Sequence, residues 1–380
     1  MANTENAAQP PKGKKDREII NPGSLLETIC QLLGSGGFGD VYLVKNVKTN
    51  TVAAMKTERQ GVEEGRQRLS LEVMILIGVT RLPEQKRAHF TRLITYGQND
   101  MFKFFVMSLV GKTISDFQRQ QKDNTFSVDL AVKISIQCLE GLSQLHELGF
   151  IHRDIKPNNF ALGVGKQTGN VIILDFGIAR RIVHKKLIDI PRKPREVVKF
   201  IGTLRYSSRN SLRMREQSRK DDLESLFYTI MEIFNIRSSF WWPEKDTYVV
   251  LTLKQKLFDG ELTLMDKFPY EMTRFMQYVD KLDYYSNPNY AYLRTLLENI
   301  LRGQGVTKED EEEQQRRLIE QTILDITQET QDEDVSGNVK EKKSDTKKKS
   351  KVAKPKKSPI PVNEKSYFNS SKLAATQEND

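Results

Sequence analysis

Residues 152–159 read His-Arg-Asp-Ile-Lys-Pro-Asn-Asn, and the rest of the chain is interpreted outward from this stretch. Asp154 supplies a carboxylate and Asn159 a side-chain amide, with a lysine between them. The apolar run Val171–Leu174 then predicts a buried strand, which ends at Asp-Phe-Gly in residues 175–177. Carboxylate and amide oxygens suit Mg²⁺, and a lysine can neutralise a moving phosphoryl group. A surface loop could hold His-Arg-Asp by chance, but not together with all the other groups.

These two motifs resemble the catalytic loop and the metal-binding loop of protein kinases. The resemblance implies an α+β, two-lobed fold, with a small antiparallel β-sheet and one helix in the N-lobe and a larger, mainly helical C-lobe. It also implies transfer of the γ-phosphate of ATP to protein hydroxyls, with Mg²⁺ bound by Asn159 and Asp175. Asp154 would orient the attacking hydroxyl, Lys156 would stabilise the γ-phosphoryl group, and Thr203 would bond near both.

A glycine-rich motif lies upstream, where residues 34–41 read Gly-Ser-Gly-Gly-Phe-Gly-Asp-Val. Dinucleotide-binding turns have the same glycine spacing, but there the glycines open a helix. Here Leu32 and Leu33 precede the glycines and the β-branched and aromatic run Val41–Val44 follows them, so we predict a strand–turn–strand hairpin. Glycine allows backbone N–H groups to approach phosphates without a Cβ in the way.

The next strand is predicted at Thr51–Lys56, and it resembles the Val-Ala-Ile-Lys strand whose lysine reaches the α/β-phosphates. Residues 66–76 then have helical spacing, with apolar residues on one face. Glu72 is the interior acid of this helix and the candidate for an ion pair with Lys56. Two nearby glutamates, at positions 63 and 64, remain alternatives because the helix register is only inferred.

The resemblance also assigns the nucleotide pocket. Met107 matches the gatekeeper behind the adenine, the hinge would span about residues 108–111, and Ala161 stands where many kinases place a larger leucine on the pocket floor. The predicted ATP-binding residues are each expected to lie near the adenine or the phosphates. They are Leu33, Gly34, Ser35, Gly36, Gly37, Phe38, Gly39, Val41, Ala54, Lys56, Met107, Leu109 and Ala161.

Composition is that of an ordinary soluble protein, with 38% hydrophobic and 29% charged residues among 380. Two cysteines, Cys30 and Cys138, argue against a disulfide framework, and we expect both to be small core residues. No run approaches the roughly 20 apolar residues of a membrane span, and the N-terminus lacks a signal-peptide core. We therefore expect an intracellular, cytoplasmic monomer without a membrane span.

Changes in composition divide the chain into three parts. Residues 1–22 are expected to be disordered, and residues 23–308 to form the kinase domain, with the N-lobe at about 23–108 and the C-lobe at about 112–308. Helical patterns stand out at Val128–Leu148, which ends before Gly149, and at Asp221–Asn235. Residues 309–380 form a low-complexity tail that is first acidic and then lysine-rich.

The lysine block of this tail, residues 340–357, leaves several interpretations open. It suits a solvated disordered tail, a tether to an anionic surface, or a nuclear-import signal that would give access to the nucleus. It could also contact the acidic block before it, or be regulated by phosphorylation at Ser344, Ser350 or Ser358.

The resemblance extends to a subfamily. Lysine and proline after the catalytic aspartate favour Ser/Thr kinases, and the segment Gly202–Ser211 lacks the usual Ala-Pro-Glu. With Arg219–Leu226 after it, this pattern is similar to the casein kinase 1 superfamily, and residues 152–163 look most like its tau-tubulin kinase branch. The family carries Ser-Ile-Asn where this chain has Ser-Arg-Asn at 208–210. Asp222 would brace the catalytic loop from a buried helix, whereas an exposed helix acid stays open for Asp221.

Local charge indicates the substrate class. The net charge is +10, and basic residues gather between Asp175 and residue 205. They are Arg180, Arg181, Lys185, Lys186, Arg192, Lys193, Arg195, Lys199 and Arg205. A like-signed cleft concentrates acidic or phosphorylated peptides, and in the resembled family the arginine matching Arg205 helps form an anion site, with Lys256 as a looser second match.

Two alternatives to this substrate prediction remain. The basic segment could be an ordinary solvated face or a nucleic-acid surface, but nucleic-acid binding is disfavoured because Phe200 and Tyr206 are its only aromatic residues. The chain could also be a nucleotide-binding pseudokinase scaffold. Every required catalytic residue type is present, which favours an active enzyme.

Overall fold

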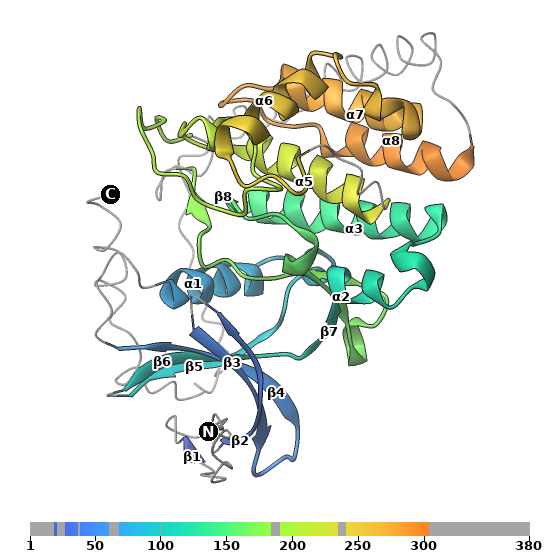
Figure 1. The fold of residues 1–380 in the computed structure, drawn as a ribbon. Coiled ribbons are helices and arrows are strands. Elements are labelled where there is room, and N and C mark those ends of the chain that lie inside the picture. The colour runs from blue at the N-terminus through green and yellow to red at the C-terminus, as the bar shows by residue number, and fades with distance from the viewer. Residues whose placement is uncertain are drawn as a thin grey trace, which may run out of the picture.

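The computed structural model describes residues 19–20, 27–36, 39–60, 68–99, 101–183, 191–234 and 241–303. It has two lobes, one built on an antiparallel sheet and one built of helices (Figure 1). The predicted α+β, two-lobed fold is therefore confirmed. The predictions for residues 1–18, Gly37, Phe38 and the tail 309–380 lie outside the described residues.

The N-lobe sheet has the strand order β1-β2-β3-β4-β6-β5, and all neighbours are antiparallel. Its strands are β1 (Ile19–Ile20), β2 (Glu27–Gly36), β3 (Gly39–Asn46), β4 (Val52–Arg59), β5 (Leu93–Gln98) and β6 (Phe102–Met107). Strand β1 falls within the segment 1–22 that composition predicted to be disordered. Its two β-branched isoleucines suit a strand, and Ile19 pairs with Thr28 of β2.

Helix α1 (Leu69–Thr80) is the only helix of the described N-lobe apart from one short 3-10 turn, and it covers one face of the sheet (Figure 1). It buries Leu69, Val73 and Leu76, as their spacing predicts. The opposite face of the sheet has a separate cluster that includes Val44, Met55 and Phe104. Alternate residues of β4 and β6 thus pack on two sides, which holds β4 rigidly in the middle of the lobe.

The helical C-lobe contains α2 (Ile114–Arg119), α3 (Val128–Glu147), α4 (Arg209–Leu212), α5 (Arg219–Ile233), α6 (Thr247–Phe258), α7 (Tyr270–Lys281) and α8 (Tyr290–Arg302). Helix α3 starts at the cap Ser127, whose hydroxyl accepts from the Leu130 N–H at 3.3 Å. It ends before Gly149, whose φ of +81° favours glycine. Both predicted C-lobe helices are present.

Short strands line the lobe boundary: β7 (Val110–Thr113), β8 (Phe150–Ile151), β9 (Phe160–Gly163), β10 (Val171–Ile173) and β11 (Arg180–Arg181). The hinge is shorter than the predicted 108–111. Val110 already pairs with Gly163 of β9, so only Ser108 and Leu109 connect β6 to the C-lobe strands. Local sequence could not show this pairing, because the partner of β7 lies more than fifty residues farther along the chain.

Helix α5 is the centre of the C-lobe core, with Leu223, Leu226 and Phe227 fully buried. Asp222 is 1% exposed and Asp221 is also 1% exposed, which excludes a solvent-exposed position for Asp221. The Asp221 carboxylate accepts from the Ser218 N–H at 2.8 Å and caps the helix, so its burial is compensated by hydrogen bonds.

The two cysteines differ in environment. Cys138 on α3 is buried, as expected, whereas Cys30 on β2 is exposed, so the prediction of a core position for Cys30 was wrong. Strand β2 lies near one edge of the sheet, and its outer part, residues 30–36, is exposed throughout. Within the described ranges, no helix has the length and apolarity needed to cross a membrane.

Candidate active site

The catalytic loop follows β8, which ends at Ile151, and is held in place by helix α5. Asp222 accepts hydrogen bonds from the backbone N–H groups of His152 at 2.6 Å and Arg153 at 2.8 Å. His146 lies 2.9 Å from the same carboxylate. Burial works to raise the pKa of Asp222, but these hydrogen bonds and the neighbouring histidines outweigh it and hold the pKa below its ordinary value. The brace implied for Asp222 is therefore present as a geometric feature.

The Asp154 carboxylate lies at the centre of a small polar network. The Thr203 hydroxyl donates to one carboxylate oxygen of Asp154 at 2.7 Å, and the Lys156 ammonium donates to the other at 2.6 Å. Lys156 also donates to the Thr203 hydroxyl at 2.9 Å. The Asn159 amide donates to the Asp154 backbone carbonyl at 2.8 Å. The structure thus brings Asp154, Lys156 and Asn159 together with Thr203, which lies 44 positions after Asn159 in the chain. All four had been predicted as site residues.

The predicted metal ligands Asn159 and Asp175 are joined through the backbone, because the Leu174 N–H donates to the Asn159 carbonyl at 2.8 Å. The Asn159 side chain uses its nitrogen toward Asp154, which leaves its amide oxygen for a cation. One amide and one carboxylate oxygen fit Mg²⁺, which usually keeps waters and phosphate oxygens as its other ligands. Among the described residues, no cluster of three His, Cys, Asp or Glu side chains could hold a metal ion instead.

Phe176 holds Asp175 toward the site. Its ring is 2% exposed and packs 5.7 Å from the His152 ring and 6.1 Å from the Phe90 ring, measured between centroids. Asp175 itself has a φ of +63°, a left-handed conformation that an aspartate adopts more readily than most residues. The anchored phenylalanine therefore turns the preceding carboxylate back toward Lys56.

Lys56 on β4 lies 2.7 Å from Glu72 on α1 and 3.0 Å from Asp175. Glu72 is thus a partner of Lys56, as predicted, while the alternatives at 63 and 64 lie outside the described residues. Burial opposes the Lys56 charge, but the two carboxylates outweigh it and raise the pKa of Lys56 above its ordinary value. Burial raises the pKa of Glu72 to about 7 against the opposing pull of Lys56. These three charged groups connect the N-lobe helix, the sheet and the metal-binding loop.

The glycine motif forms the predicted hairpin between β2 and β3, in which Gly36 pairs with Gly39. Gly39 has a φ of +125°, and a Cβ there would lie 1.8 Å from the Thr57 carbonyl oxygen. Gly34 and Gly36 instead have open space where a Cβ would point. Gly39 is therefore required by its packing against β4, whereas Gly34 and Gly36 leave their side of the hairpin accessible, as an ATP-binding cradle needs.

The residues predicted to contact the adenine lie on neighbouring strands. Ala54 of β4 is paired with Met107 at the end of β6, and Val41 of β3 is paired with Lys56. Ala161 lies on β9 opposite Ile172 and is fully buried. Leu33 is half-exposed on β2. The structure thus places Ala54 and Met107 at the end of the sheet beside the connection at Ser108 and Leu109, with Val41 opposite Lys56, two residues farther along β4.

A cavity of about 670 Å³ opens beside the catalytic network. Its lining includes Lys156, Asn159 and Thr203 from that network, and Arg205, Trp242 and Lys245 from farther along the chain. Lys256, the predicted second member of an anion site, is not among the lining residues, and its ammonium lies 3.8 Å from Glu261. Lys245 was missed because it stands in a loop before α6, where no periodicity or motif marks it.

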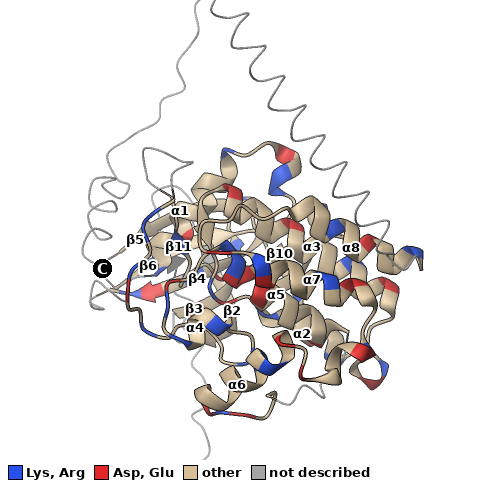
Figure 2. Cartoon of the chain, turned by 90° about the horizontal axis from the view of Figure 1, so that it is seen from above, with Lys and Arg blue, Asp and Glu red and all other residues tan. Residues whose placement is uncertain are grey.

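The basic segment is only partly available to a ligand. Arg195 and Arg180 both face the buried Glu216, at 2.6 and 3.4 Å, and Arg181 stacks 4.5 Å from the Phe150 ring centroid. Basic and acidic segments lie interspersed over the lobe (Figure 2). Several arginines of this segment therefore bind the protein itself, which leaves Arg205 as the predicted arginine that lines the cavity. Lys185 and Lys186 lie outside the described residues.

Comparison with known proteins agrees with this geometry. Residues 28–321 match the model of the protein kinase domain. Over 290 residues the chain is 34% identical to a probable serine/threonine-protein kinase of Dictyostelium discoideum, covering 75% of this chain and 56% of that protein. Over 288 residues it is 32% identical to the serine/threonine-protein kinase spe-6 of Caenorhabditis elegans, covering 72% and 71% of the two chains. Since the family match spans most of the chain and includes every residue of the catalytic network, the chain belongs to the protein kinase domain family.

Proposed function

We propose that this protein is an active Ser/Thr protein kinase, which transfers the γ-phosphate of ATP to protein hydroxyls. The observation that carries the proposal is the Asp154 carboxylate, held by Thr203 at 2.7 Å and Lys156 at 2.6 Å beside an intact Lys56–Glu72 ion pair. A pseudokinase scaffold would need none of these contacts together. The similarity to Ser/Thr kinases of two organisms supports the same reaction.

Each residue of the network has a distinct part in this reaction. Asp154 orients the substrate hydroxyl and takes up its proton, and Thr203 keeps one oxygen of that carboxylate in place. Lys156 bridges Asp154 and Thr203 and so lies where it can stabilise the transferred phosphoryl group. Lys56 holds the nucleotide phosphates, while Glu72 orients it. Mg²⁺, bound by Asn159 and Asp175, would neutralise charge on the phosphates.

The test is direct. The purified chain is incubated with Mg-ATP and acidic peptides that contain serine or threonine, and phosphate incorporation is measured. We expect transfer by the wild type and almost none by Lys56→Met, which keeps the side-chain length but removes the ammonium. Nucleotide binding without any transfer to a panel of acidic peptides would instead support a scaffold.

We further propose membership of the casein kinase 1 superfamily, closest to its tau-tubulin kinase branch, and a preference for acidic or already phosphorylated substrates. Arg205 supports the preference, because it lines the cavity beside the catalytic network and its guanidinium donates to the Trp242 carbonyl at 3.1 Å. A guanidinium held in this way loses little freedom when it binds a phosphate. The proposed setting is an intracellular monomer, cytoplasmic and with access to the nucleus.

Arg205→Ala tests the preference. We expect KM for a phosphorylated peptide to rise about tenfold, from the loss of one charged hydrogen bond of about 1.5–3 kcal/mol, while KM for ATP stays nearly unchanged. The measurement is kcat/KM for matched phosphorylated and unphosphorylated peptides. Equal losses for both peptides would mean that Arg205 only braces the activation segment.

A further inference from the structure

Helix α6 carries a lysine in an unusual place. Lys254 is 0% exposed, although lysine is among the residues least often found fully buried. From its contacts we infer that Lys254 is a positioning residue for substrate recognition, which clamps the loop that carries Arg205. This inference rests on the proposed kinase function and adds to it a residue that determines specificity without touching the substrate.

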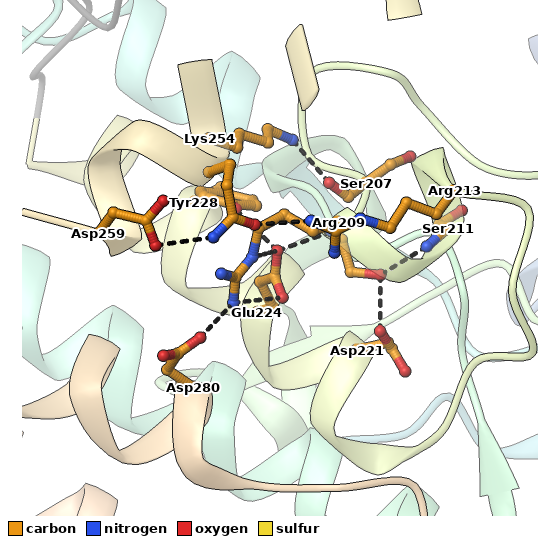
Figure 3. A network of polar contacts seen from close by, with 12 residues as sticks. Ser207, Arg209, Ser211, Arg213, Asp221, Glu224, Tyr228, Lys254, Asp259 and Asp280 are labelled. Carbon is orange, nitrogen blue, oxygen red and sulfur yellow. Dashed lines mark hydrogen bonds and ion pairs between the residues drawn. The ribbon is translucent and has the colours of Figure 1, made fainter. Parts of the chain in front are cut away.

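The clamp is made to the backbone on either side of Arg205. The Lys254 ammonium donates to the Ser207 carbonyl at 2.6 Å (Figure 3). It also reaches the Leu204 carbonyl at 3.5 Å. These two carbonyls flank the Arg205-Tyr206 pair, so one ammonium spans the whole turn. The turn itself is tight, because the N–H groups of Tyr206 and Ser207 both donate to the Thr203 carbonyl at 3.0 Å.

Aromatic side chains enclose the ammonium. Its nitrogen lies 4.0 Å from the centroid of the Tyr228 ring and 5.7 Å from that of Trp241. Trp241 acts on the same loop, since its indole N–H donates to the Arg205 carbonyl at 3.2 Å. Three successive parts of the loop are thus held from helix α6 and from the segment before it, by Lys254, by Trp241 and by the Trp242 carbonyl that binds the Arg205 side chain.

The complete burial of Lys254 requires an explanation. Burial lowers the pKa of Lys254 well below its ordinary value, so the environment disfavours the charged form. A methionine would fill the same volume without this cost. What the lysine supplies and a methionine cannot is a set of hydrogen-bond donors for the inward-facing carbonyls of the loop. A buried carbonyl left without a donor would shift the loop toward water.

The loop connects the clamp to recognition. Its first residue, Thr203, bonds to Asp154, and Arg205 lines the cavity two residues later. Thr203 has its own anchors, Asp154 and Lys156, whereas the backbone around Arg205 depends on Lys254 and Trp241. Loss of the clamp should therefore displace Arg205 more than the catalytic groups, and it should affect peptide binding more than ATP binding.

The chain offers a matched control two residues along the same helix. Lys256 lies on a different face of α6, its side chain is 50% exposed, and it faces Glu261 at 3.8 Å. The experiment compares wild type, Lys254→Met, Lys254→Gln and Lys256→Met. For each protein, KM and kcat are measured with ATP, with a phosphorylated peptide and with its unphosphorylated counterpart, and folding is checked by thermal melting.

We expect Lys254→Met to raise KM for the phosphorylated peptide by up to about tenfold, the effect expected for losing the Arg205 contact itself, and to leave KM for ATP within about twofold of wild type. Lys254→Gln keeps a donor and should show a smaller rise, and it decides the matter if Lys254→Met does not fold. Lys256→Met should behave as wild type. An unchanged KM in both Lys254 variants, or an equal loss with both peptides, would overturn the inference.

Failure of the proposed function would look different, because the wild type and Lys256→Met would then transfer no phosphate either. Binding of a fluorescent phosphopeptide to the wild type, Lys254→Gln and Lys256→Met, followed by anisotropy, tests the clamp in that case. Weaker binding by Lys254→Gln alone supports the clamp, and equal binding by all three proteins contradicts it.

Discussion

Single side chains in this site act through the partners that hold them. Asp154 has no special conformation of its own; its orientation comes from Thr203, Lys156 and Asn159, each of which donates to it. Its loop is in turn set by the two backbone hydrogen bonds to Asp222. A change of one atom in the carboxylate should therefore alter the chemistry while leaving the surrounding structure intact.

Asp154→Asn makes that change. The amide has nearly the same shape but cannot take up a proton, so we expect kcat to fall by at least about a hundredfold. KM for ATP and the melting temperature should remain close to the wild-type values. Steady-state kinetics measure kcat and KM for ATP, nucleotide titration measures ATP binding, and thermal melting measures stability. Near-normal turnover by a folded variant would refute the role of Asp154.

Glu72 allows a prediction about pH. Its pKa in the folded protein is raised to about 7, above the 4.5 of an ordinary glutamate. Between these two values the folded state binds the proton more tightly than the unfolded state does, so this group makes the free energy of unfolding fall as pH rises from 4.5 to 7. Glu72→Gln has no proton to release, and its unfolding free energy should lack this contribution.

The measurement is urea unfolding of both proteins from pH 4.5 to 7.5. The free energy of unfolding of the wild type should fall with pH more steeply than that of Glu72→Gln, by a slope that corresponds to at most about one proton. Identical slopes would contradict the raised pKa.

Separately, ATP binding by wild type should strengthen as pH rises through 7, because ionised Glu72 pairs with Lys56. Glu72→Gln should not show that change.

At the scale of elements, the β2–β3 hairpin contains a test with an internal control. A Cβ on Gly39 would lie 1.8 Å from the Thr57 carbonyl, whereas a Cβ on Gly36 would meet nothing within 4 Å. Gly39→Ala should therefore destabilise the N-lobe by more than about 1 kcal/mol, through strain at positive φ and the clash with β4. Gly36→Ala should change stability by less. Denaturant unfolding of both variants checks the difference, and equal effects would refute the packing role of Gly39.

Short helix α4 is joined to α5 and α7 through Arg209, the residue at which the chain departs from the resembled family. Its guanidinium bonds to buried Glu224 at 3.1 Å and to Asp280 at 2.7 Å (Figure 3). It also lies 3.5 Å from the Phe258 ring centroid. Where the resembled family has isoleucine, this chain therefore has a residue that is held by ion pairs. These carboxylates outweigh the effect of burial and raise the pKa of Arg209 above its ordinary value.

Arg209→Leu leaves Glu224, whose side chain is 1% exposed, without its cation. Removing one partner of a buried pair costs about 3–5 kcal/mol, so we expect a strongly lowered melting temperature. Asp280→Asn removes the partner whose side chain is 48% exposed and should cost below about 1 kcal/mol. Similar losses in the two variants would show that the pair with Glu224 contributes no more than a surface ion pair.

At the scale of the whole molecule, the total charge of +10 is a poor guide to recognition. Arg180 and Arg195 are occupied by Glu216, and Arg209 by Glu224 and Asp280. The charges around the cavity include Arg205 and Lys245 but also Glu244. Selectivity is therefore expected to come from a few positions and to depend on ionic strength.

Added salt should lower kcat/KM for a phosphorylated peptide more than for its unphosphorylated counterpart, because the Debye length shortens from about 10 Å at 0.1 M to about 3 Å at 1 M. Arg205→Ala should reduce this difference. Initial rates in 50 to 500 mM NaCl measure it, with KM for ATP as the reference, and a preference that is independent of salt would argue against electrostatic selection.

Much of the fold and of the candidate site could be predicted from the sequence. Residues 152–159 and 175–177 predicted two loops that resemble the catalytic and metal-binding loops of kinases. Apolar and β-branched runs predicted β3, β4 and β10, and helical spacing predicted α1, α3 and α5, within a few residues. These features are local: a motif needs its residue types at a given spacing, and an amphipathic element needs one period. The pairing of Lys56 with Glu72 was expected from the resemblance to protein kinases, together with the position of Glu72 inside the predicted helix.

Only the tertiary structure decided which charges are buried together. Spacing could not show that Asp221 is buried, that β7 shortens the hinge, that Lys245 rather than Lys256 lines the cavity, or that Lys254 clamps a loop 47 residues before it. The physical reason is that burial of a polar side chain is set by its partners, and here the partners come from distant segments. A lysine on a helix looks the same in sequence whether it faces water or the backbone carbonyls of a distant loop.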